Sequence, residues 1–152
     1  MRKIDFNKKV ILSRMQLIEK YLGRLEELRQ LPRRQFLLPD NLDIASWNLR
    51  CALEAVFDIC AHILARIPGV KVSEYKQMAL EMGRQKIVSK SFARNKLYKM
   101  GGYRNRLTHF YFEVTPQELY KIIQDDLGDF KSFLKDIKKL LNKQDGKNKA
   151  KK

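Results

Sequence analysis

The sequence predicts an all-α protein, an antiparallel bundle of about five helices. Apolar residues recur at three- and four-residue steps through most of the chain, and no segment alternates apolar and polar residues as a strand would. Only four prolines and seven glycines interrupt the 152 residues. With 44% hydrophobic residues the chain can bury a core, and its length is typical of one domain.

The first two helices are expected at about residues 4–30 and 43–64. Pro32 and Pro39 bracket the connection between them, and Pro68-Gly69 ends the second helix. The apolar positions that define the two helices are Val10, Ile11, Leu17, Ile18, Tyr21, Leu22, Leu25, Leu28, Trp47, Leu53, Val56, Ile59, Cys60, Ile63 and Leu64.

A short third helix is expected at about residues 73–82, with Gly83 in the C-terminal position that ends it. A fourth helical segment is expected at about residues 89–111. It contains the pair Gly101-Gly102, and each interior glycine costs a helix roughly 1 kcal/mol relative to alanine. The pair therefore predicts either a kink or a close approach of the backbone to another helix or to a ligand.

The last helix has the clearest start in the chain. Thr115-Pro116-Gln117-Glu118 forms a capping box with proline at the first helical position. One apolar face then continues from Leu119 to Leu141. Beyond it the chain is polar and rich in lysine. We therefore expect a helical domain over residues 1–142 and a disordered basic tail over residues 143–152.

The charge of the chain is strongly basic. Lysine and arginine outnumber aspartate and glutamate by 32 to 17, which gives a net charge of +15. Such a surplus attracts polyanions, either nucleic acid or an acidic protein; a generally solubilising surface with a basic tail is the alternative. No apolar run is long enough to span a bilayer, and residues 1–9 lack the apolar core of a signal peptide. We expect a cytoplasmic protein without membrane contact.

Cys51 and Cys60 lie nine residues apart on the expected second helix. On a regular helix they are about 13 Å apart along the axis and half a turn out of phase, so no disulfide can join them. Neither has a nearby cysteine or histidine partner for a metal ion. We interpret both as small buried hydrophobic residues, and we predict no metal site.

Residues 82–112 form a long basic stretch. The stretch contains eight lysines and arginines and no aspartate or glutamate, with aromatic residues between the cations. Cations without acids attract phosphates, and exposed aromatic rings can stack on unpaired bases. Some of these rings must instead fill the core, and a solvated basic face without a ligand is the alternative.

Within this stretch, Arg104 and His109 form an Arg-x4-His pattern, which is a weak indication by itself. His109 is one of only two histidines, and it closes the expected helix just before a turn. A histidine can accept and donate a proton near neutral pH, and a guanidinium is suited to a charged phosphate.

Two segments carry a resemblance to a known family. Residues 103–111 read YRNRLTHFY, which resembles the R-N-x-x-x-H-x-Y signature of HepT-like proteins, a branch of the HEPN superfamily. Residues 49–63 read LRCALEAVFDICAHI, which is similar to that family's second helix, where an E-A-x-x-D-I-x-x-H-I pattern recurs. The resemblance covers nearly the whole chain apart from the tail.

The resemblance implies a metal-independent endoribonuclease toxin that needs no cofactor and forms a two-fold symmetric homodimer, with the RNA cleft between the two copies. It also implies a nucleotidyltransferase antitoxin as partner. Arg104 would hold the scissile phosphate, Asn105 would position it, and His109 would transfer protons. Tyr111 would be the tyrosine that the antitoxin adenylylates, and the added AMP would turn the enzyme off.

Helix geometry complicates a site built from one chain. Arg104 and His109 are five residues apart, so they differ in direction by about 140° on a regular helix. A kink at Gly101-Gly102, the long arginine side chain or a site made of two chains would bring them together, and we favour the dimer.

Two other functions are alternatives to the ribonuclease. One is a non-catalytic helical dimer that binds nucleic acid or a nucleotide and partners a nucleotidyltransferase. The other is a DNA-binding regulator, which charge alone suggests and no helix-turn-helix pattern supports. On the second helix, Asp58 and His62 lie at i and i+4, and we interpret them as a hydrogen-bonded structural pair, with Arg50 also structural.

Overall fold

The computed structural model describes residues 5–109 and 113–150, with side chains up to residue 146. Every regular element within these residues is helical, which confirms the predicted fold class. The elements are α1 (Lys8–Arg29), α2 (Arg33–Phe36), α3 (Pro39–Leu64), α4 (Tyr75–Arg84), α5 (Lys90–Phe92), the π-helical turn η1 (Ala93–Leu97), α6 (Tyr98–His109), α7 (Pro116–Asp125) and α8 (Gly128–Ala150).

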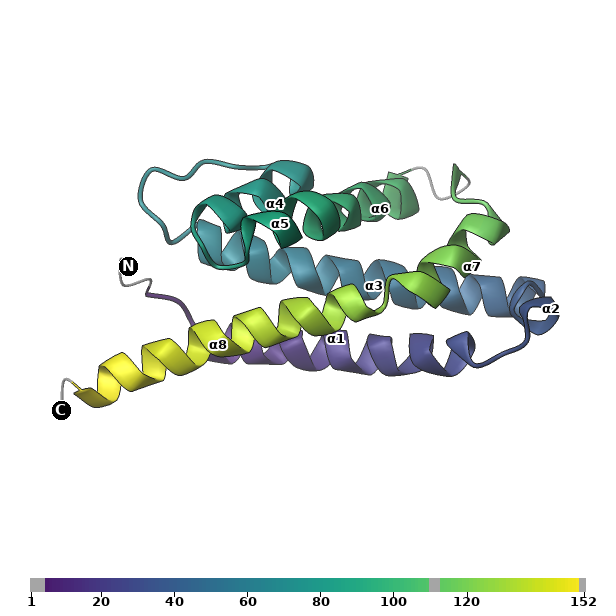
Figure 1. Cartoon of the computed structure of the whole chain (residues 1–152), viewed down its shortest axis with the longest axis horizontal. Helices are drawn as coiled ribbons and strands as arrows, with labels where there is room; N and C mark the ends of the chain where they lie inside the picture. The colour runs from purple at the N-terminus through teal and green to yellow at the C-terminus, as the bar shows by residue number, and fades with distance from the viewer. Residues whose placement is uncertain (1–4, 110–112, 151–152) are drawn as a thin grey trace.

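The three long helices α1, α3 and α8 set the length of the bundle, and α4, α5 and α6 cover another side of α3 (Figure 1). α1 and α3 are antiparallel and make the most extensive contact between any two helices described. The start of α1 and the end of α8 lie at one end of the bundle, whereas α2 and α7 lie at the other (Figure 1). None of the helices in the described ranges has an apolar stretch long enough to cross a membrane.

The beginnings of α1 and α3 differ from the predicted ones because of their caps. α1 begins at Lys8, since the Asn7 side chain accepts hydrogen bonds from the backbone N–H groups of Lys9 and Val10. The predicted start near residue 4 is therefore wrong. α3 begins at Pro39, earlier than predicted, because proline is favoured in the first helical turn.

Gly83 does not end α4, contrary to prediction. It is buried inside the helix, which runs to Arg84. A Cβ at Gly83 would lie 2.6 Å from the Cβ of Ala93, so the glycine allows α4 and η1 to pack closely. The left-handed residue that follows α4 is Lys86, three positions after Gly83, with φ 60°.

Gly101 resolves the alternatives left open for the glycine pair. A Cβ at this position would lie 3.2 Å from the backbone of both Tyr75 and Lys76, which is tighter than ordinary contact. The pair therefore marks a close approach of α6 to the first residues of α4. At Gly102 the nearest atom is the flexible end of the Lys76 side chain, at 3.4 Å.

The predicted last helix is two helices. Thr115 caps α7 as predicted, since its side-chain oxygen accepts a hydrogen bond from the Glu118 N–H. The helix then breaks between Asp125 and Gly128, although the apolar pattern continues across the break; glycine has a low helix propensity. α8 runs on to Ala150, beyond the boundary at residue 142 where we expected disorder to begin. The boundary of the functional domain stays a prediction.

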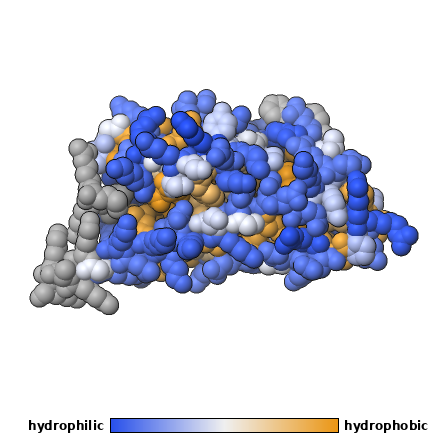
Figure 2. Space-filling model, in the orientation of Figure 1, coloured by the Kyte–Doolittle hydropathy of each residue, from blue (hydrophilic) through white to orange (hydrophobic). Residues whose placement is uncertain are grey.

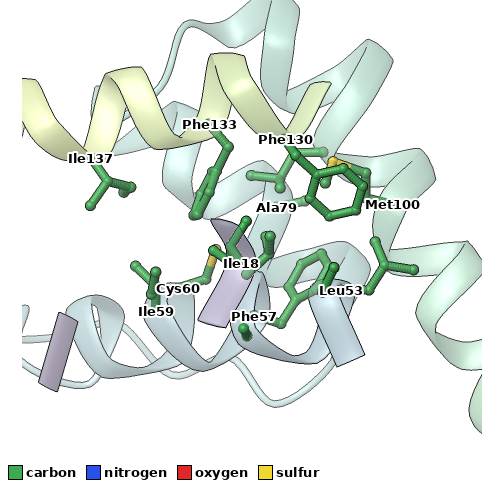
Figure 3. Close-up of a cluster of buried hydrophobic side chains, with 14 of the residues drawn as sticks. Ile18, Leu53, Phe57, Ile59, Cys60, Ala79, Met100, Phe130, Phe133 and Ile137 are labelled. Carbon is green, nitrogen blue, oxygen red and sulfur yellow. The ribbon is translucent and has the colours of Figure 1, made fainter. Parts of the chain in front are cut away.

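The core gathers apolar side chains from five helices. Figure 3 shows Ile18 of α1, Phe57 of α3, Ala79 of α4, Met100 of α6 and Phe133 of α8 turned toward one another. All of these side chains are buried. Their burial fixes α6 on α3 and α4, which positions the side chains on the opposite face of α6.

Candidate functional site

An open groove lies where α6 meets the start of α4. Its volume is about 570 Å³, and α6 contributes Arg104, Asn105 and His109 to its lining. Ser73, Glu74, Tyr75 and Lys76 line the other wall. The structure thus places three of the four predicted site residues on one groove of one chain. Tyr111, the fourth, lies outside the described residues.

Arg104 and His109 both line this groove, although they point in different directions from α6. Arg104 is mostly buried, with 13% of its side chain exposed, and reaches the groove from the interior between α3 and α4. His109 is exposed and lies at the last residue of α6. One groove therefore has a fixed guanidinium at its base and an imidazole at its rim.

Arg104 is held on two sides. Its Nη2 donates a hydrogen bond to Oε1 of Glu54 at 3.3 Å, and its guanidinium lies 4.1 Å from the centre of the Tyr75 ring. A planar cation is attracted both to a carboxylate and to the face of an aromatic ring. Nε of Arg104 is buried without a hydrogen-bond partner among the described residues. These contacts fix the position of the guanidinium.

Tyr75 is itself positioned by the packing of α4. Its ring meets Phe57 of α3 edge to face, with centres 5.3 Å apart. Gly101 allows α6 to approach the backbone of Tyr75, so that Arg104, one turn later on α6, can stack on the ring. Tyr75 was not predicted as a site residue, because its contact with Arg104 depends on how two helices cross and no local pattern marks it.

Glu54 is the second site residue that was not predicted. It shares its carboxylate between Arg104 and Arg50, whose Nε lies 3.7 Å from the same oxygen. Glu54 stands in the second-helix segment that resembles the HepT-like pattern, so a signal was present. Only the fold shows that it faces Arg104.

The described lining of the groove includes two cations, Lys76 and Arg104, and one carboxylate, that of Glu74. Arg104 is paired with Glu54, whereas Lys76 has no ion pair among the described residues. Glu74, the N-cap residue of α4, makes no side-chain hydrogen bond to the start of this helix, and the first N–H groups of a helix carry partial positive charge. The groove is therefore suited to an anionic group such as a phosphate.

The other cations of α6 are neutralised by carboxylates that are distant in sequence. Arg106 makes two hydrogen bonds to Glu118 of α7, at 2.5 and 2.7 Å, and these hydrogen bonds lower the pKa of Glu118. Lys99 forms an ion pair with Asp126 at 3.2 Å. The stretch that lacks acids in the sequence is thus largely paired in space, along α6.

The predicted Asp58–His62 pair is replaced by two separate contacts to the start of the chain. His62 Nε2 accepts a hydrogen bond from the backbone N–H of Asn7 at 3.1 Å, and Asp58 forms an ion pair with Arg14 at 3.4 Å. Burial raises the pKa of Asp58, and the Arg14 charge opposes that rise. Both residues therefore hold α1 against α3, a structural role as expected.

The described residues contain neither a disulfide nor a cluster of metal ligands. Cys60 is free and buried, as predicted, and burial raises the pKa of its thiol far above the ordinary value. Cys51 is also free but only half-buried, so its predicted burial is wrong. Across residues 5–109 and 113–150, no three His, Cys, Asp or Glu side chains are grouped so as to hold a metal ion.

Characterised proteins resemble this chain in both sequence and fold. The chain is 24% identical over 133 residues to the tRNA nuclease HepT of Aphanizomenon flos-aquae, a match that covers 87% of this chain and 90% of that protein. A tri-AMPylated Shewanella oneidensis HEPN toxin, solved in complex with its MNT antitoxin, is 25% identical with a TM-score of 0.75, over 87% of this chain and 98% of that one.

A second solved structure, a toxin–antitoxin crystal structure with AMP-PNP, has the same fold, with a TM-score of 0.73 at 23% identity over 86% of this chain and 98% of that one. The family model described as Ribonuclease HepT-like matches residues 18–137. Because this match spans most of the sequence, the chain belongs to the HepT-like ribonuclease family.

Proposed function

We propose that this protein is a metal-independent endoribonuclease toxin that cleaves RNA in the groove between α4 and α6. The observation that carries the proposal is the meeting of Arg104, Asn105 and His109 on one groove, in a chain of the HepT-like ribonuclease family. The relative named a tRNA nuclease makes tRNA the first substrate to test.

The chemistry needs only a proton acceptor, a proton donor and a fixed cation. RNA carries its own nucleophile: the 2′-hydroxyl attacks the adjacent phosphorus, its proton passes to the His109 imidazole, and a 2′,3′-cyclic phosphate forms. The bond from phosphorus to the 5′-oxygen breaks, and that oxygen takes up the proton that the His109 imidazolium returns. Arg104 stabilises the charge that develops on the phosphoryl oxygens.

The contacts of Arg104 are compatible with this role. A guanidinium has five N–H donors, and Glu54 accepts from Nη2 only. The stack on Tyr75 and the bond to Glu54 restrict the guanidinium to one orientation before RNA binds. A cation that is oriented in advance stabilises a transition state without the cost of reorganisation. Asn105, on the same groove, would orient the phosphate or its neighbour.

We further propose that two copies pair around this groove as a homodimer. The groove is open, and His109 at its rim is exposed. Tyr98, which is 39% exposed, lies near the groove because the Lys76 ammonium is 5.4 Å from its ring. Exposed aromatic rings are enriched at the centres of protein interfaces. A two-fold axis here would bring two copies of the Arg104–His109 segment together.

The partner in this proposal is a nucleotidyltransferase antitoxin that adenylylates Tyr111 in a cytoplasmic toxin–antitoxin module. Support comes from the structural relative, an AMPylated HEPN toxin bound to an MNT antitoxin. Tyr111 is two residues beyond His109 in the sequence. AMP on that tyrosine would add negative charge and bulk near Arg104, and would compete with RNA for the guanidinium.

The test is cleavage of unfractionated tRNA by purified protein in EDTA, beside a His109→Ala variant. We expect cleavage by the wild type without added metal, and a loss of at least roughly 100-fold in the variant. Cleavage that requires a metal ion, or that survives in the variant, would count against the proposal. Binding without cleavage in both proteins would favour the non-catalytic binding dimer.

Modification is tested separately by mass spectrometry after co-expression with the nucleotidyltransferase. We expect a mass increase of one or more AMP units on the peptide that contains Tyr111, and none in a Tyr111→Phe variant. An unshifted peptide in the wild type would contradict this part of the proposal.

A further inference from the structure

A second groove lies between α8 and the turn that follows α4. Four lysines line it: Lys86 and Lys90 from the turn and the start of α5, and Lys139 and Lys143 from α8. Its volume is about 310 Å³. We call it the lysine groove. It belongs to the end of the bundle where α8 finishes, away from α7 and the last turn of α6 (Figure 1).

The floor of the lysine groove is apolar. Ile87, Val88 and Leu140 line it, and each is at least nine-tenths buried. On the face that carries α8, Figure 2 shows hydrophobic surface in the trough beside this helix, between hydrophilic side chains. The groove is therefore a depression with a firm floor and charged rims, instead of a flat charged surface.

The charge of the lysine groove is not neutralised. Asp136 is the only carboxylate among its lining residues, and no ion pair within the described ranges involves any of the four lysines. The four ammonium groups are exposed. This arrangement differs from α6, where Lys99 and Arg106 have carboxylate partners.

The turn that carries Lys86 is held rigidly. Lys86 has φ 60°, a left-handed conformation that a residue with a side chain seldom adopts. Its N–H donates to the Gly83 carbonyl at 3.0 Å, and the Ile87 N–H donates to the Met82 carbonyl at 3.0 Å. A left-handed residue with this pair of hydrogen bonds is the Schellman motif, which ends many helices. It fixes the turn after α4, from which Lys86 lines the groove together with residues of α8.

A smaller basic groove adjoins the first. It shares Gly83 and Lys90 with the lysine groove and adds Arg84 and Arg94 to its lining. Arg84 is partly neutralised by Glu81, at 2.7 Å, whereas Arg94 has no ion pair among the residues described. The two grooves together give a basic track along this end of the bundle.

We propose that the lysine groove binds phosphates of the RNA backbone, at a place separate from the groove that cleaves it. That the polyanion is RNA rests on the proposed function. Lysine is a flexible point charge that contacts phosphates whatever the base sequence. Lysine is depleted in protein–protein interfaces, which favour arginine and aromatic residues, so RNA fits this groove better than an acidic protein surface does.

The experiment compares two double variants of equal charge change in a His109→Ala background, which separates binding from cleavage. Lys90→Glu with Lys139→Glu alters one lysine on each wall of the groove. Arg34→Glu with Lys121→Glu alters two exposed cations of α2 and α7, at the other end of the bundle. Circular dichroism and the Tm check that each protein is folded.

Binding of unfractionated tRNA is measured over a series of salt concentrations. We expect the groove variant to bind roughly tenfold more weakly than the control variant at about 0.15 M salt. We also expect the slope of log Kd against log salt to fall by about 1 to 2, since each lost phosphate contact removes nearly one released counterion.

Equal affinities of the two variants would overturn the inference, as would a failure of the His109→Ala protein itself to bind tRNA. Intact RNA binding with lost binding of the nucleotidyltransferase would overturn it too, and would assign the groove to that partner. The result does not depend on cleavage: a wild-type protein that binds tRNA through the groove but does not cut it would contradict only the proposed function.

Discussion

The two basic regions of this molecule, α6 and the lysine groove, use their charges in opposite ways. On α6, the cations Lys99, Arg104 and Arg106 each contact a carboxylate from another element. Around the lysine groove, Lys86 and Lys139 have no such partner in the described structure, and neither do the other two lysines.

This difference shows that a cluster of cations in the sequence does not reveal which of them lack a carboxylate partner in the folded protein. An ion pair holds a side chain in one place, whereas an unpaired exposed lysine keeps its counterions and can exchange them for phosphates. We therefore expect changes on α6 to affect chemistry and stability, and changes at the lysine groove to affect RNA affinity. Four predictions test this division.

The largest effect is expected from Arg104→Lys. Lysine keeps the positive charge but loses the planar face that stacks on Tyr75 and the donors that remain beside Glu54. We expect kcat/KM for RNA cleavage to fall by about 100-fold or more, with tRNA affinity changed by less than about threefold. Steady-state cleavage and binding assays measure both, and Arg34→Lys, the same change at an exposed arginine of α2 outside both grooves, is the matched control. Full activity of Arg104→Lys would show that charge alone suffices.

Gly101→Ala tests how closely α6 must approach α4. Alanine gains roughly 1 kcal/mol of helix propensity, but its Cβ would lie 3.2 Å from the backbone of Tyr75 and Lys76, which cannot give way as a side-chain end can. We expect a net loss of about 1 to 2 kcal/mol in the free energy of unfolding, with reduced cleavage, because Arg104 shifts from the Tyr75 ring.

Gly102→Ala is the control for that prediction. The nearest atom to its new Cβ is the end of the Lys76 side chain, at 3.4 Å, which can move. We expect this variant to be as stable as the wild type or up to about 1 kcal/mol more stable, by urea denaturation. A destabilisation equal to that of Gly101→Ala would remove the special role of the contact with Tyr75.

These glycines also show what the sequence could and could not predict. Apolar periodicity predicted the helices, and the Thr115 cap was predicted because capping depends on neighbours in the chain. The close approach at Gly101 was one of two alternatives, whereas Gly83 was assigned to a helix end although it packs against Ala93. Whether a glycine ends a helix or allows a second helix to pack closely against it depends on how the helices cross. The local sequence does not encode that crossing.

The candidate site likewise contains residues that the sequence predicted and residues that it did not. The motif indicated Arg104, Asn105 and His109, and the structure places them on one groove. Glu54 and Tyr75, the two groups that hold Arg104, come from α3 and α4 and were not predicted. Partners across helices depend on side-chain direction after packing, so a pattern within one helix cannot identify them.

A smaller effect is expected from Arg106→Gln, with Lys90→Gln as its counterpart in the lysine groove. Arg106 donates to Glu118 twice and to the Glu113 carbonyl at 3.0 Å, and its side chain is 32% exposed. We expect Arg106→Gln to lose about 1 kcal/mol of stability with little change in tRNA affinity. We expect Lys90→Gln to leave the stability nearly unchanged and to weaken tRNA binding. Thermal unfolding and tRNA titration separate the two, and the same result for both variants would erase the distinction between the regions.

The smallest effect concerns pH and again separates paired from unpaired charge. Hydrogen bonds from Arg106 hold the pKa of Glu118 below its ordinary value. The pair therefore stabilises the fold above the ordinary glutamate pKa, and this contribution is lost as pH falls through the lower pKa of the folded state. We expect the loss to be under about 1 kcal/mol, since both side chains are partly exposed.

The measurement must be a difference between variants, because other carboxylates act in the opposite direction. Burial raises the pKa of Asp58 and of Asp129, so each favours the folded state as pH falls. Subtracting the urea-denaturation stability of Arg106→Gln from that of the wild type, at each pH between about 3 and 7, cancels these contributions. The difference should shrink toward acid pH for Arg106→Gln. For Lys90→Gln it should stay flat, because an unpaired lysine has no carboxylate to lose; a pH-dependent difference there would show that the lysine groove is internally paired.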